Sequence, residues 1–456
     1  MQPEVENTTT VRRPRFLLVA YSCQPFRGSE PGIGWHRALQ AARVADTWVI
    51  CRQEDSQEKI EEYFHEYPPV EGLKFVYLPH SPTESRIRQR SLLGYIAYNR
   101  WQRRALALAR ELHAQHQFHL VHQVNFGTFR EPGYTWKLDI PFVWGPIGGT
   151  QNYPAQFLAG AGWNVAVREG TRTLVNRFQL HTSRRVKQAA RRANALVATN
   201  SDAVRDFQRV LGCDSIRLLD SGVEALRPPR DVPQQLDRPL RLLWCGVLEP
   251  RKALELLLEA IAILPEGIHV ELRVLGKGKM LNKWRRLARK RGIENQVEFA
   301  GEVPHEACLA AYEWADAFAF SSLRDNSATV NSEALASGLP IICLDHQGVG
   351  DMVDESCGIK VPLTNRRDAA LGFRDAIVRL ATEPDLRKLL SAGAYERAKK
   401  FLWHNNGNEM LQIYEQVLRD AGHAFDLCDD QATPTEINGS LPNAKVKQSQ
   451  HVDSNN

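Results

Sequence analysis

The sequence predicts an α/β protein built from two doubly wound domains in tandem. Short apolar runs alternate with longer amphipathic stretches, a pattern typical of parallel strands covered by helices on both faces. A proline-rich segment, residues 224–239, interrupts the alternation, which restarts directly after it. A chain of 456 residues also exceeds what one hydrophobic core ordinarily holds.

The first predicted domain covers residues 14–223, after a flexible tail at residues 1–13. Residues 16–21 form a buried strand, followed by a glycine-rich loop and a helix through Ala45. The further strands expected in this domain are residues 48–51, 75–78, 120–126, 141–144 and 196–199.

The second predicted domain covers residues 240–393, and residues 224–239 form the linker. A strand at residues 240–248 precedes a helix at residues 252–264, whose apolar stripe is Leu254, Leu257, Leu258 and Ile261. The further strands expected in this domain are residues 270–275, 297–300, 317–321 and 341–344. A C-terminal helix at residues 394–422 could pack back across the first domain, and the polar tail 423–456 is expected to be disordered.

Composition narrows the class of protein. Hydrophobic residues make up 43% and charged residues 24%, the balance of a soluble globular chain, and a net charge of +5 does not indicate a nucleic-acid partner. No apolar run of about 18 residues is present, and the first ten residues lack the apolar core of a secretion signal. The eight cysteines show no Cys-x-x-Cys spacing. We therefore expect a cytoplasmic enzyme without structural disulfides.

The segment 321–345 is the most informative about a catalytic or binding site. A strand ends at Ser321, a polar turn carries Asp325, a helix contains Glu333, and Gly338 ends that helix. Asp325 therefore lies just beyond the carboxyl end of a strand, beside a helix N-terminus that favours anionic groups. Two acids at this spacing would occur about six times by chance, so the specificity comes from the strand–turn–helix context. The alternative is that Glu333 is a solvated helix carboxylate.

This segment resembles the acid-x7-Glu signature of the retaining nucleotide-sugar glycosyltransferases with a GT-B fold. That large family, glycosyl transferases group 1 or glycosyltransferase family four, includes sucrose-phosphate synthases and mannosyltransferases. The resemblance covers roughly residues 14–420. It implies two Rossmann-like domains facing across a cleft, a nucleotide-diphosphate-sugar donor, transfer to a saccharide or lipid-linked acceptor, and retention of anomeric configuration.

The resemblance assigns donor-site roles to the residues of this segment. Asp325 is the catalytic-site acid, and the donor sugar is also held at Ser327, Ala328 and Thr329, where helix amides are free. Glu333 binds the ribose. The first acid of the family's motif is usually Glu, so Asp325 is one methylene shorter, which affects the identity of the sugar more than the activity.

The segment 246–252 resembles the family's phosphate-binding Gly-Arg-Leu and lysine. Lys252 matches the lysine, and Val247 occupies the arginine position, so half of the usual phosphate clamp is missing. Arg251 is the nearest basic residue that could substitute. The alternative for Lys252 is a surface lysine in the first turn of a helix.

Glycine-rich turns follow strands in both predicted domains. The first turn, with Gly28 and Gly34, resembles the loop that borders acceptor and donor phosphate, and the turn with Gly148 lies on the same side. Neither is a Gly-x-Gly-x-x-Gly dinucleotide fingerprint. Gly276 and Val303 resemble residues of the loops that hold the base and the diphosphate. Tight turns are the alternative for Gly148, and for Glu30 in the first turn it is stabilisation of a helix start.

His122 ends a predicted strand where the family often has a histidine lining the sugar site, and we list it with Asp325 and Lys252 as catalytic. A structural histidine is the alternative. No Asp-x-Asp occurs to chelate a metal for the diphosphate, so we expect neither a metal nor a cofactor, the nucleotide-sugar being a substrate. Competing functions are a nucleotide-sugar epimerase of the same fold and a non-catalytic sugar-nucleotide-binding protein.

Two basic stretches suggest a membrane surface. Residues 84–110 contain seven arginines and one acid, and residues 168–192 contain eight basic residues and one acid. Such helices can lie on anionic lipid headgroups, although a solvated helical face is the alternative. Docking at the inner face of a membrane would suit an enzyme of glycan, exopolysaccharide or glycolipid synthesis.

Overall fold

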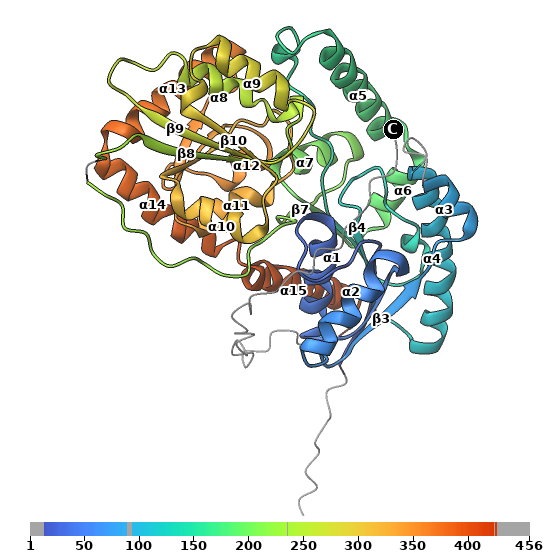
Figure 1. Ribbon diagram of the computed structural model, residues 1–456. Coiled ribbons are helices and arrows are strands. Elements are labelled where there is room, and N and C mark those ends of the chain that lie inside the picture. The colour runs from blue at the N-terminus through green and yellow to red at the C-terminus, as the bar shows by residue number, and fades with distance from the viewer. Residues whose placement is uncertain (1–12, 89–93, 235, 424, 426–456) are drawn as a thin grey trace, which may run out of the picture.

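A computed structural model describes residues 13–88, 94–234, 236–423 and 425, and its strands form two all-parallel sheets (Figure 1). The N-terminal sheet has the order β3-β2-β1-β4-β5-β6-β7 and the C-terminal sheet the order β10-β9-β8-β11-β12-β13. The strands of the first are β1 (Arg15–Ala20), β2 (Asp46–Arg52), β3 (Leu73–Leu78), β4 (Leu120–Asn125), β5 (Phe142–Ile147), β6 (Ala195–Ala198) and β7 (Ile216–Arg217). Those of the second are β8 (Leu240–Cys245), β9 (Val270–Leu275), β10 (Val297–Gly301), β11 (Ala317–Phe320), β12 (Ile341–Leu344) and β13 (Gly358–Val361).

Helices cover both faces of each sheet, so the predicted α/β class with two doubly wound sheets is confirmed. The helices up to the end of the first sheet are α1 (Ser29–Ala42), α2 (Gln53–Glu66), α3 (Pro82–Arg88), α4 (Gly94–His116), α5 (Trp163–Thr182), α6 (Arg184–Arg192) and α7 (Ser201–Asp206). The later helices are α8 (Leu254–Ile261), α9 (Leu281–Lys290), α10 (His305–Trp314), α11 (Thr329–Ala336), α12 (Gln347–Met352), α13 (Arg366–Thr382), α14 (Pro384–Lys399) and α15 (Trp403–Asp420). Among the described residues, none of these helices is long and apolar enough to cross a bilayer.

The N-terminal lobe buries both faces of its central strand. Successive side chains of β1 point to opposite faces, so Leu17 packs in the core that contains Trp101 of α4. Phe16 and Leu18 pack on the other face, in a core completed by α1 and α15. This two-sided burial is why the strand reads as a continuous apolar run.

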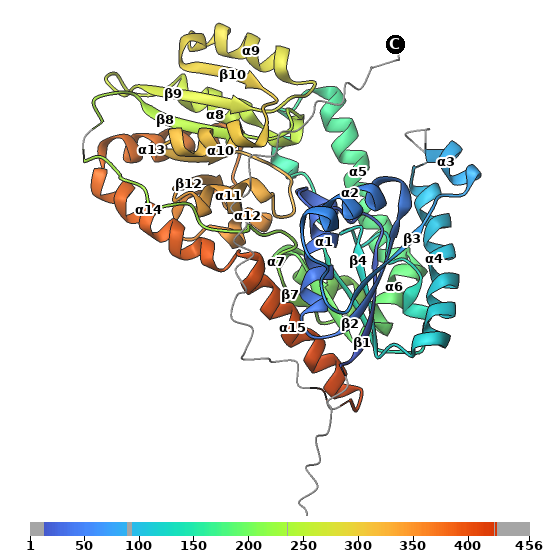
Figure 2. The same cartoon turned by 60° about the horizontal axis from the view of Figure 1, so that its bottom comes forward.

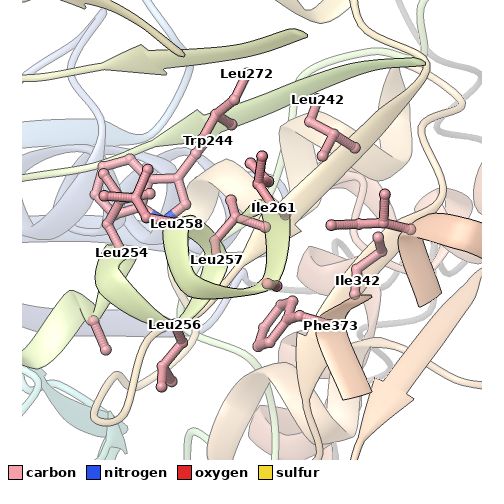
Figure 3. Close-up of a cluster of buried hydrophobic side chains, with 14 of the residues drawn as sticks. Leu242, Trp244, Leu254, Leu256, Leu257, Leu258, Ile261, Leu272, Ile342 and Phe373 are labelled. Atoms are coloured by element: carbon pink, nitrogen blue, oxygen red, sulfur yellow. The ribbon is translucent and has the colours of Figure 1, made fainter. Parts of the chain in front are cut away.

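The C-terminal lobe is organised around α8, whose predicted apolar stripe is buried. Figure 3 shows Leu254, Leu257, Leu258 and Ile261 of this helix packed with residues of the sheet and with Phe373 of α13. The helix nevertheless begins later than predicted. Residues Pro250–Lys252 form a 3-10 turn, and Ala253 has a left-handed φ of 45°, which separates that turn from α8.

The C-terminal helix predicted at residues 394–422 is two helices. Helix α14 ends at Lys399 and α15 begins at Trp403. Between them, residues 400–402 turn and pair with Val223, in the segment that leaves the N-terminal lobe. There Val223 donates to the Phe401 carbonyl (2.9 Å) and Trp403 donates to the Val223 carbonyl (2.9 Å). Helix α15 then crosses to the N-terminal lobe, as Figure 2 shows, and buries Met410 and Tyr414 there.

The short strands at one edge of each sheet, β7 and β13, were not predicted from the sequence. Strand β7 has two residues, both exposed, and β13 has four residues with two half-buried, so neither presents an apolar run. The predicted flexible tail at residues 1–13 and disordered tail at residues 423–456 lie outside the described residues, apart from residues 13, 423 and 425.

Candidate functional site

The candidate site lies at the carboxyl ends of β8 and β11, which are neighbours in the C-terminal sheet. The loops that follow them are tied together through Ser321. Its hydroxyl accepts a hydrogen bond from the Trp244 indole (3.1 Å) and donates one to the Lys252 carbonyl (2.9 Å). Leu323 N–H donates to the Arg251 carbonyl (2.8 Å). The structure therefore brings the two most informative sequence segments to one edge of one sheet.

Lys252 and Asp325 contact each other at this edge. The Lys252 ammonium donates to the Asp325 carboxylate, and its Nζ lies 5.0 Å from the centroid of the Phe320 ring. Arg251 Nη1 lies 3.2 Å from the same carboxylate and 3.1 Å from the Arg324 carbonyl. Lys252 is buried, so it is not the surface lysine that the sequence left as an alternative.

The charges of this cluster keep Asp325 ionised. Burial alone would raise the pKa of the Asp325 carboxyl, but the Lys252 ammonium and the Arg251 guanidinium outweigh it and hold the pKa below its ordinary value. The loop itself is fixed, since Asp325 N–H donates to the Gln347 side chain (2.8 Å). A negatively charged acceptor with fixed position therefore lies beside two cations.

Helix α11 starts directly after this loop. Ala328 is its N-cap, with φ 54° and ψ 99°, and Thr329 is its first residue. The first amides of a helix have no intrahelical partner, so this end can receive an anionic group. Half-buried Glu333, one turn further on, accepts a hydrogen bond from buried Tyr312 at 2.8 Å through Oε2. That bond orients the carboxylate and leaves Oε1 for another donor.

The N-terminal lobe touches the same loop. The Gly149 backbone amide donates to the Asn326 side chain (3.2 Å), and the Asn200 side-chain amide donates to the Asn326 carbonyl (3.3 Å). A Cβ added to Gly148 would lie 2.5 Å from Thr199 Oγ1 and 2.7 Å from Asn326 Oδ1. The glycine turn after β5 therefore allows the two lobes to meet at the loop that carries Asp325.

Comparison with known proteins now identifies this arrangement. Residues 230–397 match the family model described as glycosyl transferases group 1. We call the lobe that contains this matched region the group 1 lobe. Among curated relatives, a D-inositol 3-phosphate glycosyltransferase of Saccharomonospora viridis is 30% identical over 230 residues, covering 48% of this chain and 52% of that protein. One of Xylanimonas cellulosilytica is 27% identical over 302 residues, covering 57% and 70%. The matched region thus spans about half the length of the first relative.

Solved structures show that the whole fold is GT-B. A sucrose-phosphate synthase from Thermosynechococcus elongatus aligns with a TM-score of 0.61 at 18% identity, covering 90% of this chain and all of that one. A lipopolysaccharide outer core galactosyltransferase, WaaB, aligns with a TM-score of 0.59 at 13% identity, covering 88% and 99%. Anabaena HepE in complex with UDP aligns with a TM-score of 0.54 at 14% identity, covering 88% and 100%.

In the group 1 lobe, Gly276 and Val303 also lie at the carboxyl edge of the sheet. Gly276 donates to the Gly301 carbonyl (2.7 Å), and a Cβ on it would lie 2.0 Å from the Gly246 carbonyl oxygen. Half-buried Val303 packs at the margin of a core cluster of the same lobe. Gly276 allows the loop after β9 to pack against the loop after β8, and neither residue contributes a polar side chain.

His122 does not belong to this site, contrary to the sequence prediction. It is fully buried, its Nδ1 lies 2.7 Å from the Tyr414 hydroxyl, and its Nε2 lies 2.6 Å from the Gly145 carbonyl. Burial lowers the pKa of His122 to about 3, so the ring is neutral near pH 7. Its position in β4 directs it at Tyr414 of α15, a contact that the predicted return of the C-terminal helix did not specify. His122 is a core residue.

The first glycine turn also differs from the prediction. Helix α1 begins at Ser29, so Gly34 lies inside the helix, where a Cβ would come 2.2 Å from the Ser22 carbonyl oxygen. Gly34 therefore permits close packing of the helix on the preceding loop. Gly28 is the exposed N-cap of α1, and a Cβ there would meet no atom within 4 Å. A ligand can therefore approach the backbone closely at Gly28, whereas packed protein atoms prevent this at Gly34.

Two carboxyl groups near the lobe contact were not assigned from sequence. Glu30 Oε1 accepts from the Gly127 amide (2.9 Å), and its buried Oε2 has no hydrogen-bond partner. Burial raises the pKa of Glu30 to about 7, aided by the charge of Asp220. Asp220 accepts from Ser327 of the loop that carries Asp325, and burial raises the pKa of Asp220 too. Nothing in the sequence around Asp220 distinguishes it from a loop acid, because its partners come from other segments.

Proposed function

We propose that this protein is a retaining glycosyltransferase that moves a sugar from a nucleotide-diphosphate donor to a saccharide or lipid-linked acceptor. The observation that supports this most is the cluster of Lys252, Arg251 and Asp325 at the carboxyl edge of the group 1 lobe, facing the glycine turn of the other lobe. A role in glycan, exopolysaccharide or glycolipid synthesis at the cytoplasmic face of a membrane fits this activity.

The cluster supplies the charges that the reaction needs. During transfer the bond between the anomeric carbon and the diphosphate oxygen breaks, the sugar becomes oxocarbenium-like, and the acceptor hydroxyl forms the new bond and loses its proton. Lys252 and the amides at Ala328 and Thr329 stabilise negative charge on the departing diphosphate. Asp325 accepts a hydrogen bond from a sugar hydroxyl. Because these groups are fixed beforehand, they lower the barrier without reorganising.

Glu333 completes the proposed donor site. Its Oε2 is occupied by Tyr312, so Oε1 can accept from a ribose hydroxyl. Relatives support the donor class: Anabaena HepE has been solved with UDP and with UDP-glucose. The names of the curated relatives, D-inositol 3-phosphate glycosyltransferases, support a hydroxyl acceptor.

Donor identity and transfer are tested in one series. Thermal-shift measurements with UDP-, GDP- and ADP-sugars should show a raised melting temperature with one class, because binding to the native state stabilises it. With that donor, Lys252→Ala and Glu333→Ala should lower transfer by orders of magnitude. The exposed residues Lys388 and Glu355 provide matched controls, and their alanine variants should retain wild-type turnover.

Two results would contradict the proposal. Near-normal transfer by both Lys252→Ala and Glu333→Ala would refute the site. Conversion of the donor to an epimer without acceptor, or donor binding without turnover across a broad acceptor panel, would refute the transferase activity.

We further propose that transfer needs no metal ion. The chain lacks an Asp-x-Asp motif, and Lys252 with Arg251 can neutralise the diphosphate instead. Transfer should therefore be unchanged by EDTA and should not increase when Mg²⁺ or Mn²⁺ is added. Loss of activity in EDTA that Mn²⁺ restores would contradict this.

A further inference from the structure

Helix α5 presents a hydrophobic stripe to solvent. Of its twenty residues only Glu169, Asn176 and Leu180 are buried. At 3.6 residues per turn these three share one side of the helix, and the opposite side, about 60° wide, carries four exposed apolar residues. They are Trp163 (81% exposed), Val167, Leu174 (70%) and Phe178 (67%). Figure 1 shows α5 at the periphery of the molecule, leading into α6.

Basic side chains flank this stripe. Arg168 and Arg177 are exposed on its two sides, and α6 continues with Arg184, Arg191 and Arg192. The only carboxylate of α5, Glu169, is buried and paired with Arg324 (3.1 Å). The outer surface of α5 therefore combines apolar and cationic groups with no acid, which is the composition of a helix that lies in an anionic membrane interface.

A cavity of about 410 Å³ opens on the flank of the same helix. Arg172, Val175 and Gln179 of α5 line it together with Arg130 and Arg185. Gln179 Oε1 is buried without a hydrogen-bond partner. The cavity thus adjoins the apolar stripe and contains three guanidinium groups.

Two of these arginines lack a carboxylate partner within the described part of the chain. Arg130 bonds to the Asn176 amide oxygen, and Arg172 bonds to the Gln151 carbonyl (3.1 Å). Arg185 pairs with Glu131 (2.9 Å), the one acid lining the cavity. The cavity therefore holds an excess of about two positive charges, and planar guanidinium forks suit a phosphate group.

We propose that α5 docks this protein on an anionic phospholipid bilayer, with Leu174 and Phe178 inserted at the interface and a lipid phosphate seated between Arg130 and Arg172. Charge complementarity selects this occupant, because the apolar stripe lies between exposed arginines and beside a cavity with an excess of cationic side chains. The proposal identifies the helix by which the proposed transferase would contact the membrane surface that the sequence suggested. It does not depend on transfer, since it is tested by binding alone.

Vesicle co-sedimentation tests the apolar stripe. The wild-type chain should pellet with vesicles of phosphatidylglycerol and phosphatidylcholine and not with phosphatidylcholine alone. The Leu174→Ser/Phe178→Ser variant should bind roughly tenfold or more weakly, because two inserted side chains are lost. Leu389 on α14 is 64% exposed, so Leu389→Ser is the matched control and should bind like the wild type. Equal binding by the stripe variant and the wild type would overturn the docking surface.

The same assay tests the cavity. Arg130→Gln/Arg172→Gln should weaken binding at low salt roughly 30-fold, as expected for two cations near an anionic surface. Arg367→Gln, at an exposed site on α13, serves as the control. Inorganic phosphate should displace the wild type more strongly than potassium chloride of equal ionic strength, and this difference should vanish in the double variant. Binding unaffected by the double variant would remove the phosphate seat.

Folding and activity are separate readouts. Thermal unfolding of each variant shows whether weaker binding results from misfolding, and a variant that unfolds like the wild type but no longer pellets supports the proposal. A chain that binds these vesicles but transfers no sugar would refute the proposed function and leave the docking surface standing.

Discussion

At the scale of single residues, we propose that Arg251 takes the place of the arginine that the family's phosphate-binding segment usually has. Val247 stands where the resemblance expects a phosphate-binding arginine, and its side chain is 52% exposed and apolar. Arg251, four residues later, reaches the same cluster through the Asp325 carboxylate (3.2 Å). The 3-10 turn of residues 250–252, which the sequence did not predict, gives Arg251 this position.

We therefore expect Arg251→Ala to weaken donor binding by roughly 10- to 100-fold, the effect of losing one charge-assisted hydrogen bond. Val247→Ala should leave the dissociation constant unchanged. Isothermal titration with the preferred nucleotide-sugar measures both. Comparable losses in the two variants would mean that the loop as a whole, and not the guanidinium, binds the phosphate.

Glu30 should make stability depend on pH. Its pKa in the folded protein is raised to about 7 from an ordinary 4.5, chiefly by burial, so between these pH values the native state binds more protons than the unfolded state. Stability therefore falls as the pH rises through this range. Glu30→Gln keeps an acceptor for the Gly127 amide and should exceed the wild type by roughly 1–3 kcal/mol above pH 7. Chemical unfolding from pH 4.5 to 8 measures this, and a constant difference would contradict it.

At the scale of elements, sequence periodicity predicted the features that depend on a single helix or strand. The stripe of α8 and the apolar runs of β1 and β11 follow from burial on one or both faces, and the structure confirms them. The helix starts at Ser29 and Leu254 were not predicted, because the close approach at Gly34 and the turn at Ala253 depend on neighbouring segments. His122 was misassigned for the same reason, since its partner belongs to α15, 292 residues away.

Tyr414→Phe tests the structural role of His122. The variant removes the hydroxyl that bonds His122 Nδ1 and leaves a buried polar atom unpaired, so stability should fall by about 1–3 kcal/mol. Denaturant unfolding measures the loss, while turnover per folded molecule should be unchanged. Reduced turnover with unchanged stability would instead indicate that His122 acts in the active site.

At the scale of the whole molecule, polar contacts join the lobes around the loop that carries Asp325. Ser201 donates to Asp351 through its amide (2.6 Å) and its hydroxyl (2.7 Å), and Arg324 pairs with Glu169. The sequence predicted two lobes and which strand ends face the gap. It could not predict these pairs, because each joins residues more than a hundred positions apart.

Gly148→Ala should loosen the contact between the lobes, since its Cβ would displace the side chains of Thr199 and Asn326. Small-angle X-ray scattering shows whether the radius of gyration increases, and transfer should fall because the loop that carries Asp325 loses its contact with the other lobe. At Gly170, in α5, a Cβ would meet no atom within 4 Å, so Gly170→Ala is the control. An unchanged radius with normal transfer would show that the turn adapts to the larger residue.

Two of the chain's passages between the lobes lie side by side where Val223 bridges to Leu402. Trp403 stacks on His36 there, with ring centroids 4.1 Å apart, and a Cβ on Gly222 would lie 2.8 Å from that indole. A protease that cut only one of these two passages would leave both halves joined through the other.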